Sequence, residues 1–191
     1  MKSIQEIKEE LKRAPEEELP ALCALYQEDG RKGVQSLLQQ AKKRLERLER
    51  EKQRIEAMRA YEEQYGHLGY ICGIDEVGRG PFAGPVVAGA VILPRDCRIL
   101  YINDSKQLSE KKREELYEEI LEKAVAAEVG YASPARIDEI NILQATYEAM
   151  REAVSKLPVK PQILLNDAVN YILNHLQIVI YSKAIAIMKF S

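Results

Sequence analysis

The fold is decided by the stretch GIDEVGRG, residues 73–80. It closes an apolar segment that begins at Tyr70, so a strand is expected over residues 70–75, with two acids at its end. A second run, PVVAGAVIL over residues 85–93, is apolar and rich in β-branched side chains. Such a run is typical of a strand buried on both faces of a sheet. The glycines between the two runs predict a tight connection.

The residues after this pair of strands alternate between helical and strand patterns. Ser109 and the Ser133-Pro134 pair have the sequence of helix starts. We expect a helix over 109–127, a strand over 128–132, a helix over 133–157 and a strand over 162–167. The last strand ends in Asp167, so two strands of one α/β sheet end in carboxylates. Ligand and metal sites gather at strand ends in such sheets.

The first 65 residues predict an α-helical extension. Ser3 and Glu6 form a capping-box pattern, and Pro15 followed by three glutamates predicts a second helix start. A long third helix is expected over residues 34–64, ended by Gly66 and Gly69. The predicted organisation is a helical N-terminal extension over residues 1–65, an α/β domain over 70–169 and a tail over 170–191.

Composition excludes two classes of protein. The 191 residues are 46% apolar and 30% charged, with a formal net charge of −2, so the chain is neither wholly disordered nor uniformly basic. Acids outnumber bases over residues 1–30, and bases outnumber acids over residues 31–65. The basic segment is either the solvated face of a helical hairpin or an arm that lies along nucleic acid, and both interpretations can hold at once.

The cysteines and the chain ends predict a cytoplasmic protein. Three cysteines without metal-ligand spacing, behind a charged N-terminus, indicate reduced thiols inside the cell. The most apolar run, residues 176–190, is interrupted by Lys183 and is too short to span a bilayer. No membrane association is therefore expected.

Asp75 and Glu76 have two interpretations. Adjacent carboxylates that converge where a strand opens into a glycine turn form a hard oxygen site for Mg²⁺ or Mn²⁺. The alternative is an acidic pair that begins a solvated turn. Gly78-Arg79-Gly80 is likewise either a plain tight turn or a loop that lets a ligand approach the backbone closely.

Four blocks of sequence, in order, resemble ribonuclease HII, the bacterial type 2 ribonuclease H. They are DEVGRGPFAGPVVAGAVILP, NDSKQLSEKKREELYEEI, IDEINILQATYEAM and ILLNDAV, and together they extend over residues 71–169. The long basic helix also resembles an extension that some Gram-positive members carry. The resemblance implies a ribonuclease H-like mixed sheet with flanking helices, preceded by the helical extension.

The resemblance also implies an activity. Family members cleave the RNA strand of RNA–DNA hybrids and at ribonucleotides embedded in DNA, leaving 3′-hydroxyl and 5′-phosphate ends, a role in DNA replication and repair. They use four acidic residues and divalent metal, Mn²⁺ or Mg²⁺. Asp75, Glu76 and Asp167 match three of those acids, both as metal ligands and as catalytic residues. Asn166 stands where members usually have a small apolar residue. A monomer is expected.

Substrate contacts are implied at two loops. Gly78, Arg79 and Gly80 match the loop whose backbone reads the ribose 2′-hydroxyl, with Arg79 adding a phosphate contact. Ser105 and Lys106 match a segment that contacts the nucleic-acid backbone. The basic residues Lys111, Lys112 and Arg113, just beyond it, are expected to be solvated helix charges.

The resemblance weakens beyond residue 169. Residues 168–191 contain no aspartate or glutamate and so supply no fourth acid. We therefore expect a C-terminally truncated or frameshifted member, poorly stable and with little or no turnover. Three hypotheses stay open: an active ribonuclease HII, an inactive remnant that at most binds RNA–DNA hybrid, and a helical interaction module unrelated to catalysis.

Overall fold

The computed structural model describes residues 2–80, 84–166 and 177–180. The chain divides into two compact units, Met1–Ala57 and Met58–Ser191, and each is described by itself. The ranges predicted for the extension, the α/β domain and the tail remain predictions.

The first unit is a helical hairpin packed on a long helix. It contains α1 (Ile4–Arg13), α2 (Leu19–Leu25) and most of α3 (Lys32–Met58). The predicted capping box is present, because the Ser3 hydroxyl accepts from the Glu6 amide and the Glu6 carboxylate accepts from the Ser3 amide. The apolar faces of the three helices share one small core, made of Ile7, Leu11, Ala14, Leu19, Cys23, Val34, Leu38 and Ala41.

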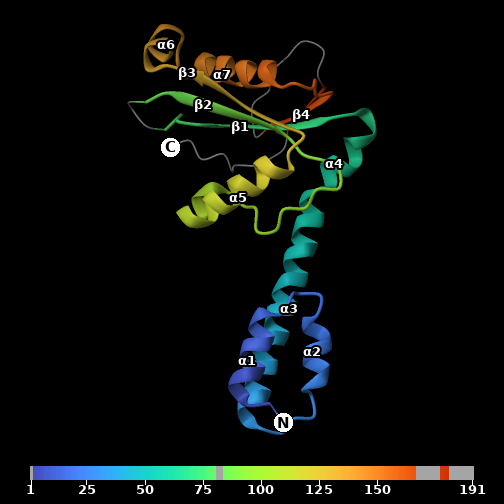
Figure 1. Ribbon diagram of the computed structural model, residues 1–191. Helices are drawn as coiled ribbons and strands as arrows, with labels where there is room; N and C mark the ends of the chain where they lie inside the picture. The colour runs from blue at the N-terminus through green and yellow to red at the C-terminus, as the bar shows by residue number, and fades with distance from the viewer. Residues whose placement is uncertain (1, 81–83, 167–176, 181–191) are drawn as a thin grey trace. The chain divides into compact units, whose positions relative to one another are not determined.

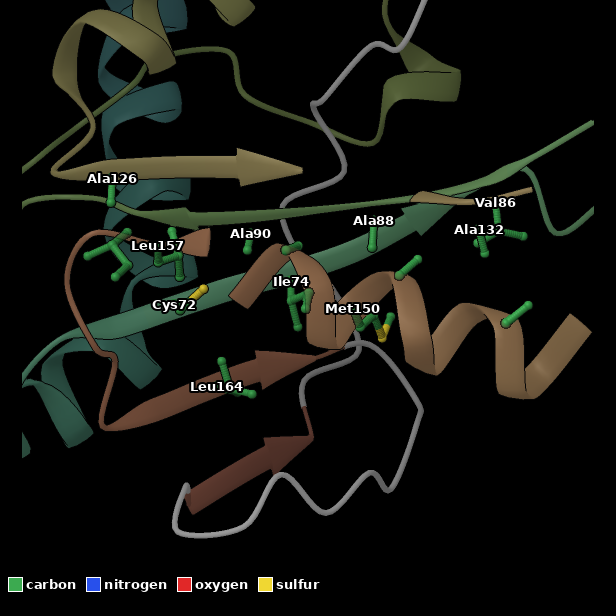
Figure 2. Close-up of a cluster of buried hydrophobic side chains, with 14 residues drawn as sticks. Cys72, Ile74, Val86, Ala88, Ala90, Ala126, Ala132, Met150, Leu157 and Leu164 are labelled. Carbon is green, nitrogen blue, oxygen red and sulfur yellow. The ribbon is translucent and has the colours of Figure 1, made fainter. Parts of the chain in front are cut away.

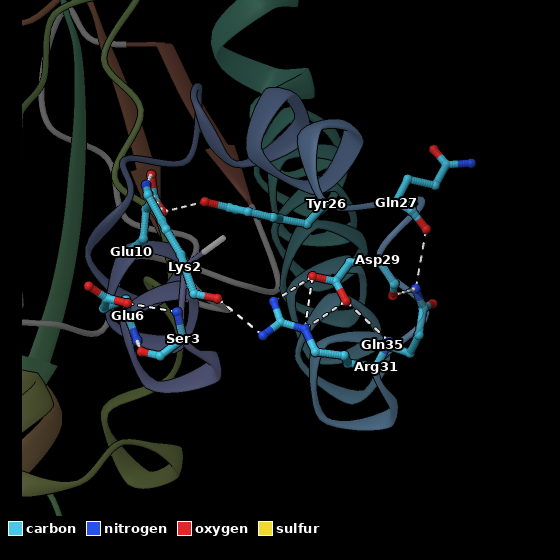
Figure 3. A network of polar contacts seen from close by, with 9 residues as sticks. All are labelled: Lys2, Ser3, Glu6, Glu10, Tyr26, Gln27, Asp29, Arg31 and Gln35. Atoms are coloured by element: carbon cyan, nitrogen blue, oxygen red, sulfur yellow. Dashed lines mark hydrogen bonds and ion pairs between the residues drawn. The ribbon is translucent and has the colours of Figure 1, made fainter.

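Polar contacts fix the turns of this unit (Figure 3). Lys2 forms an ion pair with Glu10, and the Tyr26 hydroxyl donates to the same carboxylate at 2.7 Å. Arg31 binds Asp29 with both Nε and Nη2 and donates from Nη1 to the Lys2 carbonyl. These contacts tie the start of α1 to the turn that precedes α3.

The predicted helix over residues 34–64 is wrong at its end. α3 stops at Met58, a separate helix α4 covers Ala60–Tyr65, and a 3-10 turn, η1, covers Gly66–Leu68. Arg59 lies between the two helices, and its guanidinium donates to the Arg95 carbonyl. A tertiary contact to a distant loop therefore accompanies a break that helical periodicity does not reveal.

The second unit is built on a mixed five-stranded sheet in the order β3-β2-β1-β4-β5 (Figure 1). The strands are β1 (Ile71–Val77), β2 (Val86–Ile92), β3 (Ala126–Ala132), β4 (Ile163–Asn166) and β5 (Gln177–Ile180). β2 pairs antiparallel with both β1 and β3, whereas β1–β4 and β4–β5 are parallel. The predicted mixed sheet with flanking helices is confirmed. β5 lies in the tail, where no element was expected.

Helix α7 (Ile142–Lys156) covers one face of the sheet, and α5 (Glu110–Lys123) lies on the opposite side (Figure 1). The core beneath α7 joins small and branched side chains of β1 and β2 to Ala145, Ala149, Met150 and Ala153 of the helix (Figure 2). A Cβ on Gly130 of β3 would lie 1.9 Å from the Ala149 carbonyl oxygen. Glycine is therefore required where β3 meets α7.

The helix predicted over residues 133–157 is in fact two. α6 spans Pro134–Ile140, and α7 begins after Asn141, which has a φ of 72°. The Asn141 side-chain oxygen accepts from the amides of Leu143 and Gln144, so this residue ends one helix and caps the next. Across the break, Arg136 binds Glu148 with two nitrogens. The helix predicted over 109–127 is also shorter, because Ala126 already belongs to β3.

Candidate active site at the end of strand β1

Asp75 and Glu76 lie in the middle strand of the sheet. The strand was expected to end at Asp75, which would let the two carboxylates converge, but β1 continues to Val77 because Val77 pairs with Val87. Asp75 pairs with Gly89, and Glu76 pairs with Ala88. Successive residues of a strand point to opposite faces. The two acids therefore begin on opposite faces of the sheet rather than side by side.

Glu76 is on the face covered by α7, in line with buried Cys72 and Ile74. Its side chain is only 14% exposed, and Arg79 Nη1 donates to its Oε1 at 2.9 Å. This ion pair neutralises a carboxylate that is nearly out of water and holds the loop against the strand. The sequence pattern gave Arg79 a phosphate contact and did not reveal this internal partner.

The two loop glycines differ in what surrounds them. Gly78 has a φ of 99°, and a Cβ there would lie 2.2 Å from the Pro85 carbonyl oxygen. None of the described residues lies within 4 Å of the position of a Cβ on Gly80. Gly78 is thus required by the chain itself, where the connection between β1 and β2 closes. Gly80 leaves its backbone open, as the close approach of a ligand demands.

Strand β4 pairs with β1 and ends close to Asp75. Asn166, the last residue of β4, pairs with Ile74 and is buried, so β4 ends one residue short of the level of Asp75. Asp167 follows in the sequence and lies outside the described residues. Over the described ranges, no group of three or more acid, histidine or cysteine side chains is arranged to hold a metal. The described part of the site supplies two carboxylates, which are the hard oxygen ligands that Mg²⁺ and Mn²⁺ prefer.

The second predicted contact loop is a 3-10 turn, η2 (Ser105–Gln107), just before α5. Ser105 is half-buried there, whereas the side chain of Lys106 is outside what the structure describes. Arg113 was expected to be a solvated charge, and this is wrong. Its Nη1 donates to the carbonyls of Ser105, at 3.2 Å, and Leu108, at 2.9 Å. Arg113 therefore links the loop to the first turns of α5.

The cysteines form no disulfide with one another. The three cysteines, Cys23, Cys72 and Cys97, are free thiols. Burial raises the pKa of Cys72 in β1 to about 12, so it stays protonated beside the site at neutral pH. None of the helices in the described ranges is both long and apolar enough to cross a bilayer.

Known proteins match both units of the chain. A family model described as "Ribonuclease HII N-terminal domain" matches residues 3–66, and one described as "Ribonuclease HII" matches residues 72–189. The second match continues past residue 169, where the resemblance was expected to weaken.

Two curated relatives are each named ribonuclease HII. One, from Lachnoclostridium phytofermentans, is 59% identical over 166 residues, which is 87% of this chain and 65% of the relative. Another, from Enterococcus faecalis, is 49% identical over 168 residues, 87% of this chain and 66% of the relative. The chain thus spans less than two thirds of the length of these relatives.

A solved structure, the ribonuclease H2 from Pyrococcus horikoshii, is 26% identical, with a TM-score of 0.47 over 58% of this chain and 61% of that one. The match of the ribonuclease HII model to residues 72–189, more than half of the sequence, assigns the family. The chain belongs to the ribonuclease HII family.

Proposed function

We propose that this protein is an endoribonuclease that cleaves the RNA strand of RNA–DNA hybrids and the junction at ribonucleotides embedded in duplex DNA. In the reaction, a water oxygen bonds to the phosphorus, the bond from phosphorus to the 3′-oxygen breaks, and that oxygen takes a proton. The products carry a 3′-hydroxyl and a 5′-phosphate. One observation carries the proposal: Asp75 and Glu76 lie in the central strand and lead directly into a loop whose Gly80 backbone is open.

Asp75, Glu76 and Asp167 are the residues proposed to hold divalent metal, Mg²⁺ or Mn²⁺. Two metal ions held by these residues would lower the pKa of a coordinated water and neutralise charge on the phosphate. The contribution of Asp75 is an oxygen donor in a strand that neighbouring strands hold from both sides. The contribution of Arg79 is an ion pair that holds the Glu76 side chain in place.

Substrate recognition is assigned to the backbone at Gly78 and Gly80, to Arg79, and to the loop containing Ser105 and Lys106. The 2′-hydroxyl distinguishes RNA from DNA, and close main-chain approach can read it. The partner is therefore an RNA–DNA hybrid or DNA that contains ribonucleotides, bound by a monomer. Free thiols at all three cysteines fit a reducing compartment, and we propose the cytoplasm.

A cleavage assay tests the proposal. The substrate is a labelled DNA duplex with a single embedded ribonucleotide, incubated with Mn²⁺ or Mg²⁺ and either the parent chain or Asp75→Asn. A matched control is Asp96→Asn, which removes an exposed carboxylate from another loop. Cleavage by the parent and by Asp96→Asn, but not by Asp75→Asn, is the expected result. Equal cleavage by all three would assign the activity to something other than this site.

A second candidate function is binding of RNA–DNA hybrid without cleavage. It is favoured by the absence of any aspartate or glutamate from residues 168–191, which leaves that segment without a fourth metal ligand. In the same assay this candidate predicts intact substrate in every lane, together with a gel shift of the hybrid that is retained in Asp75→Asn.

A further inference from the structure

One side of α3 carries a row of basic residues. Lys43, Arg47 and Arg50 follow one another at spacings of four and three residues, which places them along one side of a helix. Lys32, at the N-terminal end of α3, lies on the same side of the helix. Arg54, four residues after Arg50, extends the row towards the C-terminal end. We call Lys43, Arg47 and Arg50 the basic stripe, and all three are exposed.

The stripe is on the side of α3 that faces away from the core of its unit. The helix buries Val34, Leu38 and Ala41 against α1 and α2. At about 100° per residue, the stripe lies about 180° around the helix axis from these buried residues. The exposed positions Ser36, Gln39 and Gln40 beside the row are uncharged, and one exposed carboxylate, Glu46, borders it. The row itself carries three positive charges and no negative charge.

Several other charges of this unit form internal ion pairs. Lys2 binds Glu10, Arg31 binds Asp29, and Arg54 binds Glu51 (Figure 3 shows the first two pairs). Within the part of the chain that the structure describes, Lys43 and Arg47 have no ion-pair partner, and Arg50 donates only to the Glu46 carbonyl in its own helix. Three adjacent cations thus contribute nothing evident to the fold.

We propose that the basic stripe binds the phosphate backbone of the nucleic acid on which the protein acts, as a second contact surface outside the β1 site; this rests on the proposed function. From Lys43 to Arg50 the helix rises about 10 Å. One DNA strand carries about three phosphates over such a length. A straight row of like charges matches a linear polyanion. A membrane surface would instead require apolar side chains beside the cations, and the flanking exposed residues are serine, glutamine and glutamate.

The test measures how salt weakens binding. The parent chain is compared with the triple variant Lys43→Gln, Arg47→Gln, Arg50→Gln, in which glutamine keeps the helix propensity. The control is Lys8→Gln, Lys12→Gln, Arg13→Gln, with the same change in charge on exposed positions of α1. Fluorescence anisotropy gives Kd for an RNA–DNA hybrid and for an all-DNA duplex of equal length, from 50 to 200 mM NaCl. Circular dichroism checks helix content.

Each lost phosphate contact lowers the slope of log Kd against log salt by about 0.9. We expect the stripe variant to lose about 2 to 3 from this slope on both probes, with binding at least about tenfold weaker at 100 mM salt. Arg47→Gln alone should lose about 0.9, and the control should keep the parent's slope. An unchanged slope in a folded stripe variant, an equal loss in the control, or no binding of either probe by the parent would overturn the proposal.

The outcomes separate the stripe from the proposed function. If the parent cleaves the ribonucleotide duplex, but the stripe variant has the same slope of log Kd against log salt as the parent, the inference fails and the proposed nuclease activity is retained. If cleavage is absent but the stripe variant alone loses part of the salt dependence of binding, phosphate binding by the stripe is supported and the proposed nuclease activity fails.

Discussion

At the scale of single residues, Gly78 and Gly80 are glycines for different reasons: the backbone conformation requires the first, and the second is proposed to leave room for a ligand. They are two positions apart in the same loop and look equivalent in the sequence. Gly78 is held at a positive φ against the Pro85 backbone, whereas no described residue lies within 4 Å of a Cβ on Gly80. A methyl group added at each position therefore tests a different property.

Gly78→Ala should lower the free energy of unfolding by about 2 to 4 kcal/mol, because the methyl group meets a backbone oxygen and the positive φ is strained. Gly80→Ala should change it by less than about 0.5 kcal/mol. The same Gly80→Ala change should weaken binding of a ribonucleotide-containing duplex by about tenfold, or 1.4 kcal/mol, if a ligand approaches the backbone there. Urea unfolding and anisotropy measure the two effects. Unaltered binding by Gly80→Ala would remove this loop from the substrate site.

Cys72 gives the protein a pH dependence in the alkaline range. Burial raises its folded pKa to about 12, from an ordinary value of 9.0. Since the unfolded chain loses the thiol proton first, stability is full below pH 9 and falls as pH rises from 9 towards 12, by up to about 1.4 kcal/mol per pH unit. Urea unfolding with reductant at pH 8.5, 9.5 and 10.5 should show this slope. It should be shallower in Cys72→Ala than in Cys97→Ala, and identical slopes in the two variants would contradict the assignment.

At the scale of elements, α5 does more than cover the sheet. Ser109 caps the helix by accepting from the Lys112 amide, and the Arg113 guanidinium reaches back to the preceding loop, where it donates to the carbonyl oxygens of Ser105 and Leu108. The loop carrying Ser105 is thereby held by the helix that follows it. Under the proposed function, in which this loop contacts the substrate, we expect Arg113 to act as a positioning residue through the loop.

Arg113→Gln should weaken hybrid binding by roughly three- to tenfold, because two charge-assisted hydrogen bonds to the loop are lost. Arg113→Lys should restore part of the affinity, since a cation can still reach one carbonyl. Lys111→Gln is the control, because the Lys111 side chain is 88% exposed and beside the same loop. Anisotropy at fixed salt measures all three. A loss in Lys111→Gln as large as in Arg113→Gln would indicate a general effect of charge instead of positioning.

At the scale of the whole molecule, the sheet joins strands that are far apart in the sequence. β1 pairs with β2, its neighbour in the chain, and also with β4, which begins at Ile163. Because of this long-range pairing, the site at the end of β1 can form only when the sheet itself is folded. A ligand held by β1 and by the residue after β4 would fasten the two strands together.

Mn²⁺ should therefore raise the melting temperature of the parent chain relative to EDTA. A ligand that binds only the folded state at 100 times its Kd adds about 2.7 kcal/mol to the free energy of unfolding. The increase should be absent in Asp75→Asn and retained in Asp96→Asn. Equal increases in all three proteins would locate the metal elsewhere.

The sequence by itself determined much of this protein. Alternation of apolar segments predicted the order of helices and strands, Ser3 and Ser109 marked helix starts, and the run at residues 85–93 predicted a buried strand. These features depend on neighbours in the chain, so local patterns reveal them. The motifs around Asp75 indicated the family, which the family model then assigned.

The tertiary structure decided what depends on distant partners. Pairing with β2 extends β1 to Val77 and places Asp75 and Glu76 on opposite faces. The breaks at Arg59 and Asn141, the ion pair of Arg79 with Glu76 and the role of Arg113 are equally invisible in the pattern. Each depends on a hydrogen bond or backbone conformation that exists only after the chain has folded. Sequence periodicity records which face is apolar, not which partner a polar group finds.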